Sequence, residues 1–152
     1  MTDIAEARIA LMAASENTSL PVMVSMTFEE NGRTLTGTPP EVCGIILESL
    51  GADIVGTNCS TGHVQMLENA KKLIGAVSVP VAVQPNAGLP FLRDGETAYD
   101  VDAGTFSDVM KDFAAEGAAI LGGCCGSTPE YIRLTREKTG QLPYRSEEAQ
   151  MV

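Results

Sequence analysis

The sequence predicts an α/β fold in which four strand–helix units follow one leading helix. Three observations support this prediction. Short, valine-rich apolar segments alternate with helical segments along the chain. The apolar segments recur at intervals of about 30 residues, which is the length of a βαβ unit. They are nearly continuously apolar, as is typical of parallel strands that helices cover.

The elements are expected in a regular order. A helix at 4–15 comes first, and PVMVSMTF at 21–28 is a short apolar run that predicts a buried strand. TPPEVCGIILESLG at 38–51 combines a Thr38 cap, prolines in the first turn and a closing glycine, so it predicts a helix. The remaining strands are expected at 52–59, 79–88 and 118–126, and the remaining helices at 63–77, 105–117 and 128–140. A longer loop is expected between 88 and 105.

We expect one domain over residues 1–140. The chain has 152 residues, 44% of them hydrophobic, which is enough to bury a core. No segment has the composition of a linker between two domains. The last segment, QLPYRSEEAQMV at 141–152, is polar and lacks periodicity, so it is interpreted as a surface tail.

The strand ends bear on the architecture. Polar or unusual residues lie at the end of every expected strand: Thr27, Glu29, Asn58, Cys59, Gln84, Asn86, Cys124 and Cys125. In a (β/α)₈ barrel such ends share one rim, where active sites lie. No G-x-G-x-x-G motif follows a strand, which weakens a dinucleotide-binding interpretation. Because a barrel needs eight strands and only four are expected, the residues leave half a barrel and a small open sheet as alternatives.

Composition excludes some classes of function. The net charge of −10 argues against nucleic-acid binding, which requires a basic face. No apolar run reaches the roughly 20 residues of a membrane span. The N-terminus lacks the basic and apolar regions of a signal peptide, so a cytoplasmic, thiol-reducing location is expected.

Three of the four cysteines fall at strand ends. Cys59 ends the second expected strand, and Cys124 and Cys125 end the fourth. Cys43 lies within a helix among apolar residues and is expected to be a small buried hydrophobe. His63 follows Cys59 closely, but we interpret it as a solvated residue in the first turn of a helix rather than as a ligand.

Zinc is the physical hypothesis for the three strand-end cysteines. Zn²⁺ takes thiolates in tetrahedral geometry, and a catalytic site keeps three protein ligands and one open position. The backbone can bend at Gly122, Gly123 and Gly126, so that the adjacent thiols face one ion. The following helix N-terminus, capped by Ser127 or Thr128, is expected to favour the thiolate form. On spacing alone, a redox pair and inert packing remain alternatives.

Four motifs together resemble a known family. GGCCGSTPEYI, GTNCSTG, VQPNAGLP and VSMTFEENGRTLTGT resemble the homocysteine S-methyltransferase domain, in the form found in cobalamin-dependent methionine synthases. The resemblance covers about residues 4–140. It implies an α/β fold, the C-terminal half of a (β/α)₈ barrel comprising strands five to eight. It also implies zinc at the rim, held by Cys59, Cys124 and Cys125.

The resemblance further implies a role for Asn86, as a displaceable metal ligand or a substrate contact. The sequence PNAG would equally suit an ordinary turn residue there. The implied reaction is zinc-dependent methyl transfer to the thiol of homocysteine, which forms methionine. The donor would be a methylated corrinoid protein, with methylcobalamin on a partner domain or protein, or another methyl compound.

Strands one to four of the family barrel are missing, together with the positions that bind the amino and carboxylate groups of homocysteine. The resemblance therefore implies a complementing half-barrel or a homo-oligomer. The alternative is a non-catalytic zinc-binding or assembly module.

Overall fold

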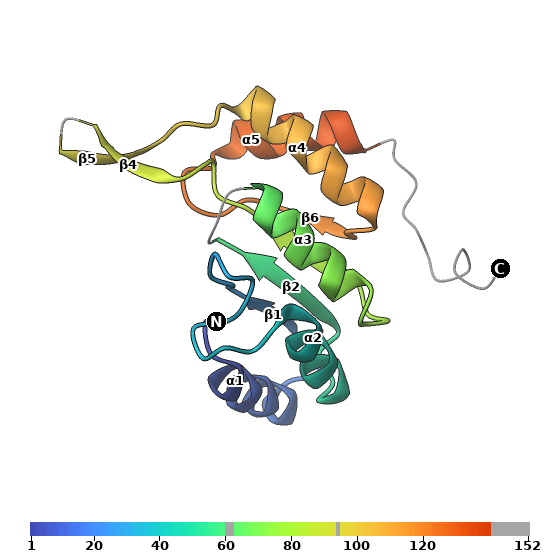
Figure 1. The fold of residues 1–152 in the computed structure, drawn as a ribbon. Coiled ribbons are helices and arrows are strands. Elements are labelled where there is room, and N and C mark those ends of the chain that lie inside the picture. The colour runs from blue at the N-terminus through green and yellow to red at the C-terminus, as the bar shows by residue number, and fades with distance from the viewer. Residues whose placement is uncertain (60–62, 94, 141–152) are drawn as a thin grey trace.

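The computed structural model describes residues 1–59, 63–93 and 95–140, and strands and helices alternate along them as expected (Figure 1). The strands are β1 (Met23–Met26), β2 (Ile54–Asn58), β3 (Val81–Gln84), β4 (Pro90–Arg93), β5 (Glu96–Tyr99) and β6 (Ile120–Leu121). The helices are α1 (Ile4–Asn17), α2 (Pro40–Ser49), α3 (His63–Ile74), α4 (Ala103–Glu116) and α5 (Pro129–Thr139). The expected tail, 141–152, lies outside the described residues.

Four of the strands form one parallel sheet in the order β1-β2-β3-β6. Each is joined to the next by a helix, and the register pairs Met26 with Thr57, Asn58 with Gln84 and Val83 with Leu121. The four predicted parallel units are therefore confirmed. The strands are shorter than expected, most of all β6 with two residues, because the chain leaves the ladder where the glycine- and cysteine-rich segment begins.

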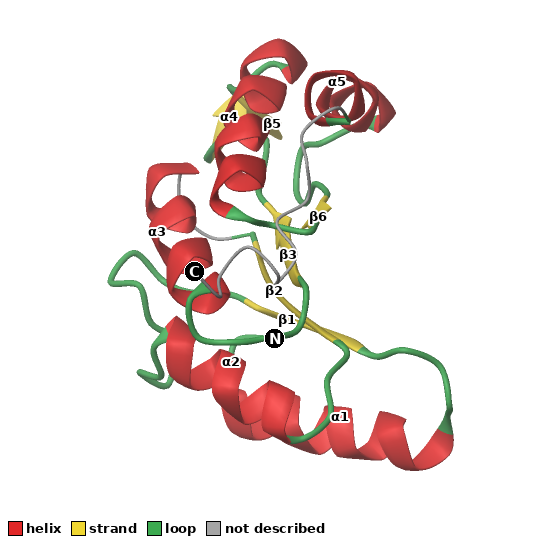
Figure 2. Ribbon diagram, turned by 90° about the vertical axis from the view of Figure 1, so that its right-hand side faces the viewer, coloured by secondary structure: helices red, strands yellow, loops and turns green. Residues whose placement is uncertain are grey.

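Consecutive helices pack against one another along the sheet (Figure 2). The core lies between them and the strands, and it includes Val55, Val83, Phe106 and Met110. This burial is the main stabilising term, since removing apolar side chains from water drives folding. In the part of the chain that the structure describes, no helix is both long and apolar enough to cross a membrane.

One expected helix cap is wrong. The N-cap of α2 is Pro39, and no side chain caps the helix, because the chain enters it through two prolines rather than through Thr38. The closing glycine is present as expected: Gly51 follows the helix with φ of +91°, a conformation that glycine adopts without strain.

The expected loop between β3 and α4 contains an antiparallel hairpin instead. β4 pairs with β5, with Phe91 opposite Ala98. The hairpin extends away from the body of the molecule (Figure 1), and its return strand ends at Tyr99. It thereby brings an aromatic residue back to the carboxyl ends of the parallel strands.

The first residues of the chain lie along the outer edge of β1. The amino group of Met1 donates to the carbonyl oxygen of Ser25 at 2.9 Å, and the N–H of Thr27 donates to the carbonyl oxygen of Met1 at 2.7 Å. This is the bonding pattern of a parallel neighbour. Met1 therefore occupies part of the outer edge of β1 in the manner of a parallel neighbour.

Candidate metal centre

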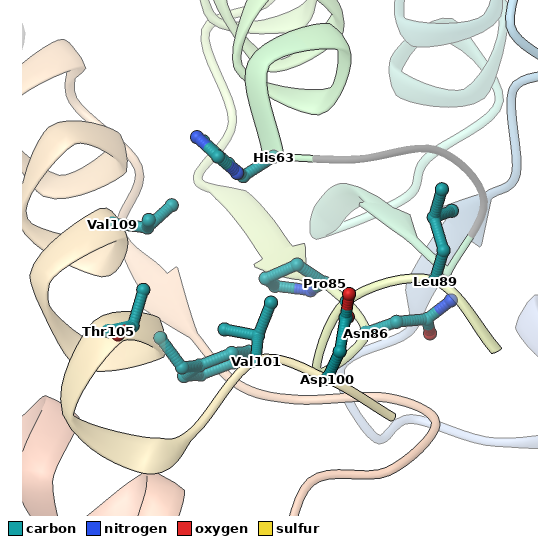
Figure 3. A pocket seen from close by; sticks show the side chains of 10 residues that line it. His63, Pro85, Asn86, Leu89, Asp100, Val101, Thr105 and Val109 are labelled. Carbon is teal, nitrogen blue, oxygen red and sulfur yellow. The ribbon is translucent and has the colours of Figure 1, made fainter. Parts of the chain in front are cut away.

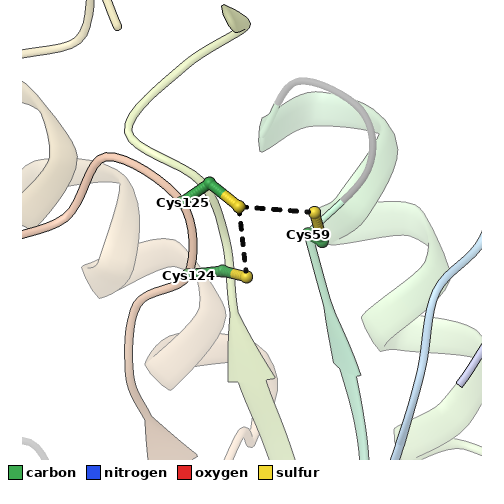
Figure 4. Close-up of side chains that lie close together, drawn as sticks. All are labelled: Cys59, Cys124 and Cys125. Atoms are coloured by element: carbon green, nitrogen blue, oxygen red, sulfur yellow. Dashed lines mark hydrogen bonds between the residues drawn. The ribbon is translucent and has the colours of Figure 1, made fainter. Parts of the chain in front are cut away.

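The three strand-end cysteines converge at one point (Figure 4). The sulfur of Cys125 lies 3.8 Å from that of Cys124 and 4.0 Å from that of Cys59, and all three sulfurs lie within 4.8 Å of one another. They come from the ends of β2 and β6, which flank β3 in the sheet. Cys125 is exposed and the other two are half-buried, so the cluster is open to solvent on one side.

Cys59 reaches the cluster through an unusual backbone conformation. Its φ is +61°. Among the described residues, it is the one non-glycine residue with a positive φ. For a residue with a Cβ, the left-handed region costs about 1–2 kcal/mol. The N–H of Cys59 still donates to the carbonyl oxygen of Gln84 at 3.0 Å, so the turn begins directly at the end of the sheet ladder.

The loop that carries Cys124 and Cys125 is fixed to the turn after β3. The N–H of Cys124 donates to the carbonyl oxygen of Pro85 at 2.8 Å, and the carbonyl oxygen of Cys125 accepts from Ala87 at 2.9 Å. The N–H of Cys125 donates to Oδ1 of Asn86 at 3.1 Å. Backbone bonds to one neighbouring turn therefore set the direction of both thiols.

Of the three site glycines, Gly126 alone has a positive φ, at +78°. A Cβ built at this position would overlap the ring of Tyr99, so the ring lies against the bare backbone. Gly122 and Gly123 are needed for close approach instead: a Cβ on Gly123 would overlap the side chain of Ser127. The expected backbone freedom is thus required at Gly126, whereas close packing explains why the other two positions are glycine.

The cap of α5 is Thr128, without a side-chain hydrogen bond. Ser127, the other cap considered from the sequence, instead donates through Oγ to the carbonyl oxygen of Cys124 at 2.6 Å. This bond closes the turn that holds the adjacent thiols.

Electrostatics at the cluster differ from the sequence expectation. The hydrogen bond with the Cys124 thiol is the main cause that raises the pKa of Cys125 above its usual value, and the charges of Cys124 and then Cys59 raise it further. Burial, and then the charge on Cys125, raise the pKa of Tyr99. Such a cluster of thiolates requires a cation for full ionisation.

Two hydrogen-bonded polar side chains, Ser25 on β1 and Asn58 on β2, lead to the sulfur of Cys124. Oγ of Ser25 donates to Oδ1 of Asn58 at 2.8 Å, and Nδ2 of Asn58 lies 3.9 Å from the sulfur of Cys124. Neither Ser25 nor Tyr99 was expected at the site. The side-chain contacts depend on strand register and on the hairpin, which no short motif encodes.

Asn86 also lines a cavity of about 240 Å³ beside the cluster (Figure 3). The cavity lies between the start of α3, the turn after β3 and the first turns of α4, and its walls are mostly apolar. His63, at the start of α3, is exposed and lines this cavity, and the sulfur cluster found among the described residues does not include it.

Cys43 does not belong to the cluster. It is fully buried on α2, and burial, followed by the charge of Glu41, raises its pKa to about 12. The prediction of a small buried hydrophobe is confirmed. A thiol in this environment is protonated and unreactive.

The donor set and the spacing suit a tetrahedral zinc ion. Thiolates at a Zn–S distance of about 2.3 Å in tetrahedral geometry lie about 3.8 Å apart. The contacts of 3.8 and 4.0 Å lie close to this edge length, and the third pair of sulfurs lies within 4.8 Å. Three thiols with one open side leave room for a fourth ligand.

Comparison with known proteins supports the resemblance. The family model described as homocysteine S-methyltransferase matches residues 1–139. The chain is 38% identical over 115 residues to a methionine synthase from Mycobacterium leprae and 37% identical over 115 residues to one from Mycobacterium tuberculosis. Each match covers 75% of this chain but 10% of the relative, so the chain spans about a tenth of the length of these proteins.

Solved structures show the same fold. The apo form of the homocysteine methyltransferase MmuM from Escherichia coli superposes with a TM-score of 0.71 at 20% identity, over 90% of this chain and 47% of that one. The metallated form gives a TM-score of 0.73 over 91% and 42% of the two chains, also at 20% identity. The parallel sheet therefore corresponds to about half of a homocysteine methyltransferase barrel, and the fold prediction is confirmed. Because the family model matches nearly the whole length of this chain, the chain belongs to the homocysteine S-methyltransferase family.

Proposed function

We propose that this chain supplies the metal-binding, thiol-activating half of a zinc-dependent homocysteine S-methyltransferase. The observation that carries the proposal is the convergence of Cys59, Cys124 and Cys125, whose sulfurs lie within 4.8 Å of one another at an open edge of the sheet. Membership of the family supports homocysteine as the methyl acceptor.

Zinc bound at the three sulfurs would act as a Lewis acid that lowers the pKa of a substrate thiol. The homocysteine sulfur would lose its proton to solvent and attack the methyl carbon of the donor. The new S–CH₃ bond forms as the bond between methyl and donor breaks, and its electron pair leaves with the donor. The product is methionine, a thioether and therefore a poorer ligand than a thiolate.

The residues of this chain hold and aim the reacting groups. The backbone bonds from Cys124 and Cys125 to the turn after β3 fix two sulfurs, and the end of β2 fixes the third. Asn86, which accepts from the N–H of Cys125, is proposed to contact the metal or the substrate, as the family resemblance implies. The exposed side of Cys125 is the side from which homocysteine would enter.

A complementing half-barrel is proposed to complete the substrate site. The outer edge of β1 is the edge that such a half would extend, and the bonds of Met1 to this edge have the parallel pattern that a neighbouring strand would use. An apolar groove of about 180 Å³ lies beside it, lined by residues of α1 and β1 that include Leu11, Met23 and Val24. A second polypeptide carrying the first four strands, or a second copy of this chain, would cover this edge.

A second candidate function is a non-catalytic zinc-binding or assembly module. The cluster of three sulfurs supports it, because these thiols can hold an ion whether or not a substrate site is present. Under this proposal the chain binds zinc but does not transfer a methyl group with or without a complementing half.

The two functions are separated by one experiment. The purified chain is loaded with zinc, and its metal content and solution mass are measured. Methyl transfer to homocysteine is then assayed from methylcobalamin and from a methylsulfonium donor. Each assay is run with the chain alone and with the N-terminal half of a related homocysteine methyltransferase domain added.

Methionine formation that requires both halves and zinc supports the enzyme. Zinc binding without methionine formation in either assay supports the module. A chain that binds no zinc contradicts both. Cys125→Ser is the matched control, because it removes one sulfur and leaves the rest of the loop in place.

A further inference from the structure

We infer that Asn58, oriented by Ser25, is a positioning residue that donates a hydrogen bond to the Cys124 thiolate when the cluster holds a metal. The inference rests on the proposed zinc site. It concerns two residues that are not ligands themselves, on two strands other than the one that leads to Cys124. Three parallel strands would thereby contribute to the position of one sulfur.

The register places the two polar side chains on one face of the sheet. Ser25 pairs with Gly56 in the parallel ladder, and Asn58 follows Gly56 by two residues. Side chains two residues apart in a strand point to the same face. Gly56 has no side chain to separate them, and Oγ of Ser25 reaches Oδ1 of Asn58 at 2.8 Å.

The bond from Ser25 sets the orientation of the amide. When the hydroxyl donates to Oδ1, the amino group of Asn58 is turned toward the sulfur of Cys124, 3.9 Å away. The opposite orientation would direct the amide oxygen at the sulfur. A thiolate accepts hydrogen bonds and repels an oxygen lone pair, so ionisation of Cys124 favours the observed orientation.

The bond would act on the charge of the cluster. Three thiolates around one divalent ion carry a net negative charge, and each N–H that points at a sulfur withdraws part of it. Hydrogen bonds from outside the ligand set typically change metal affinity by about 10- to 100-fold. The side-chain amide of Asn58 supplies such an N–H, directed at the sulfur of Cys124.

The test uses the full chain loaded with Co²⁺, which reports on thiolate ligands through sulfur-to-metal charge-transfer absorption. Asn58→Asp keeps the size of the side chain and the acceptor for Ser25 but removes the N–H donor. Asn58→Ala removes the donor without adding charge, and Ser25→Ala removes only the orienting bond. Asn69→Ala is the matched control, because this buried amide on α3 is bonded to Gln65 and not to a sulfur.

We expect both Asn58 variants to move the charge-transfer band to longer wavelength, because a thiolate without the donor holds its electrons less tightly. Their Co²⁺ affinity should fall by about 10- to 100-fold, with a smaller change for Ser25→Ala and none for Asn69→Ala. A band that stays in place in Asn58→Ala while Co²⁺ is bound would overturn the inference. A shift in Asn58→Asp alone would also overturn it, since added charge would then explain the effect.

Failure of the proposed function gives a different result. If the unchanged chain bound Co²⁺ without charge-transfer absorption from thiolates, the proposed metal centre itself would be wrong. Circular dichroism of each variant shows whether it is folded. If neither Asn58 variant folds, the Ser25→Ala band decides: an unshifted band counts against the inference and a shifted one supports it.

Discussion

The two turns that carry the thiols reach the same point by different means. Cys59 follows a regular five-residue strand and turns in a single residue, with φ of +61° on a side chain that disfavours it. Cys124 and Cys125 follow a two-residue strand, in a loop that contains Gly126 and is bonded to the turn after β3. The first turn depends on local strain, and the second depends on its neighbours.

The difference teaches where each turn is vulnerable. At Cys59, a residue that tolerates the left-handed region should relieve the backbone. At Gly126, any residue with a Cβ would have to adopt a positive φ, and its Cβ would also overlap the ring of Tyr99. Substitutions and labelling at the two turns test this difference.

The largest effect should come from removing a sulfur from either turn. Cys59→Ser and Cys125→Ser should each reduce bound zinc from about one ion per chain to less than about a tenth, because hydroxyl is a much weaker ligand than thiolate. Metal content after dialysis against a mild chelator measures this. Cys43→Ala is the control and should keep the full content. Retention of zinc by only one of the two serine variants would show that one turn alone holds the ion.

The second measurement compares the alkylation rates of the thiols in the two turns with that of Cys43, which lies on α2. Iodoacetamide should modify the three clustered thiols of the metal-free chain more than about a hundredfold faster than Cys43, which is buried and has a pKa of about 12. Mass spectrometry of timed samples gives the rates. Zinc should slow the three fast reactions and leave the slow one unchanged. Modification of Cys43 at a similar rate to the others would mean that α2 opens readily.

The third measurement tests the glycine loop. Gly126→Ala should lower the free energy of unfolding by about 2–4 kcal/mol, since it combines a left-handed backbone with overpacking against Tyr99. Gly51→Ala has φ of +91° in open space and should lose only about 1–2 kcal/mol. Urea denaturation gives both values. Adding Tyr99→Ala to Gly126→Ala should recover the overpacking part, and no recovery would contradict the contact.

The smallest effect is expected at Cys59. Without metal, Cys59→Asn should be about 1 kcal/mol more stable than Cys59→Ala, because asparagine adopts the left-handed region more readily than alanine does. Both variants lack the thiol, so the difference in their unfolding free energies reports on the backbone. Equal stabilities would mean that the turn relaxes to another conformation when the sulfur is absent.

Much of the fold follows from the sequence because parallel strands are recognisable as short apolar runs. Val81–Gln84 and Ile54–Asn58 are such runs, and both are strands in the sheet. The hairpin differs from the expected loop, although the Asp-Gly pair at 94–95 is a typical hairpin signal and Gly95 has φ of +84°. The neighbouring apolar residues are too few and too exposed to stand out as strands.

The site was predictable as a set of residues but not as an arrangement. The motifs name the three cysteines, which the structure brings together, and Asn86, which accepts from the N–H of Cys125 and whose role at the metal stays a prediction. The contact between Tyr99 and Gly126 depends on where the hairpin returns. The contact between Ser25 and Asn58 depends on the register of β1 and β2. Long-range geometry of this kind has no local signature in a single sequence.

The order of the strands gives the metal centre a mechanical consequence. Because β3 lies between β2 and β6, an ion held by all three sulfurs would cross over the end of β3 and tether the chain at residue 59 to the chain at residue 124. β6 has only two paired residues of its own. Ligand binding to the folded state adds its free energy to folding, so occupancy of the cluster would anchor the shortest strand and the last helix to the rest of the sheet.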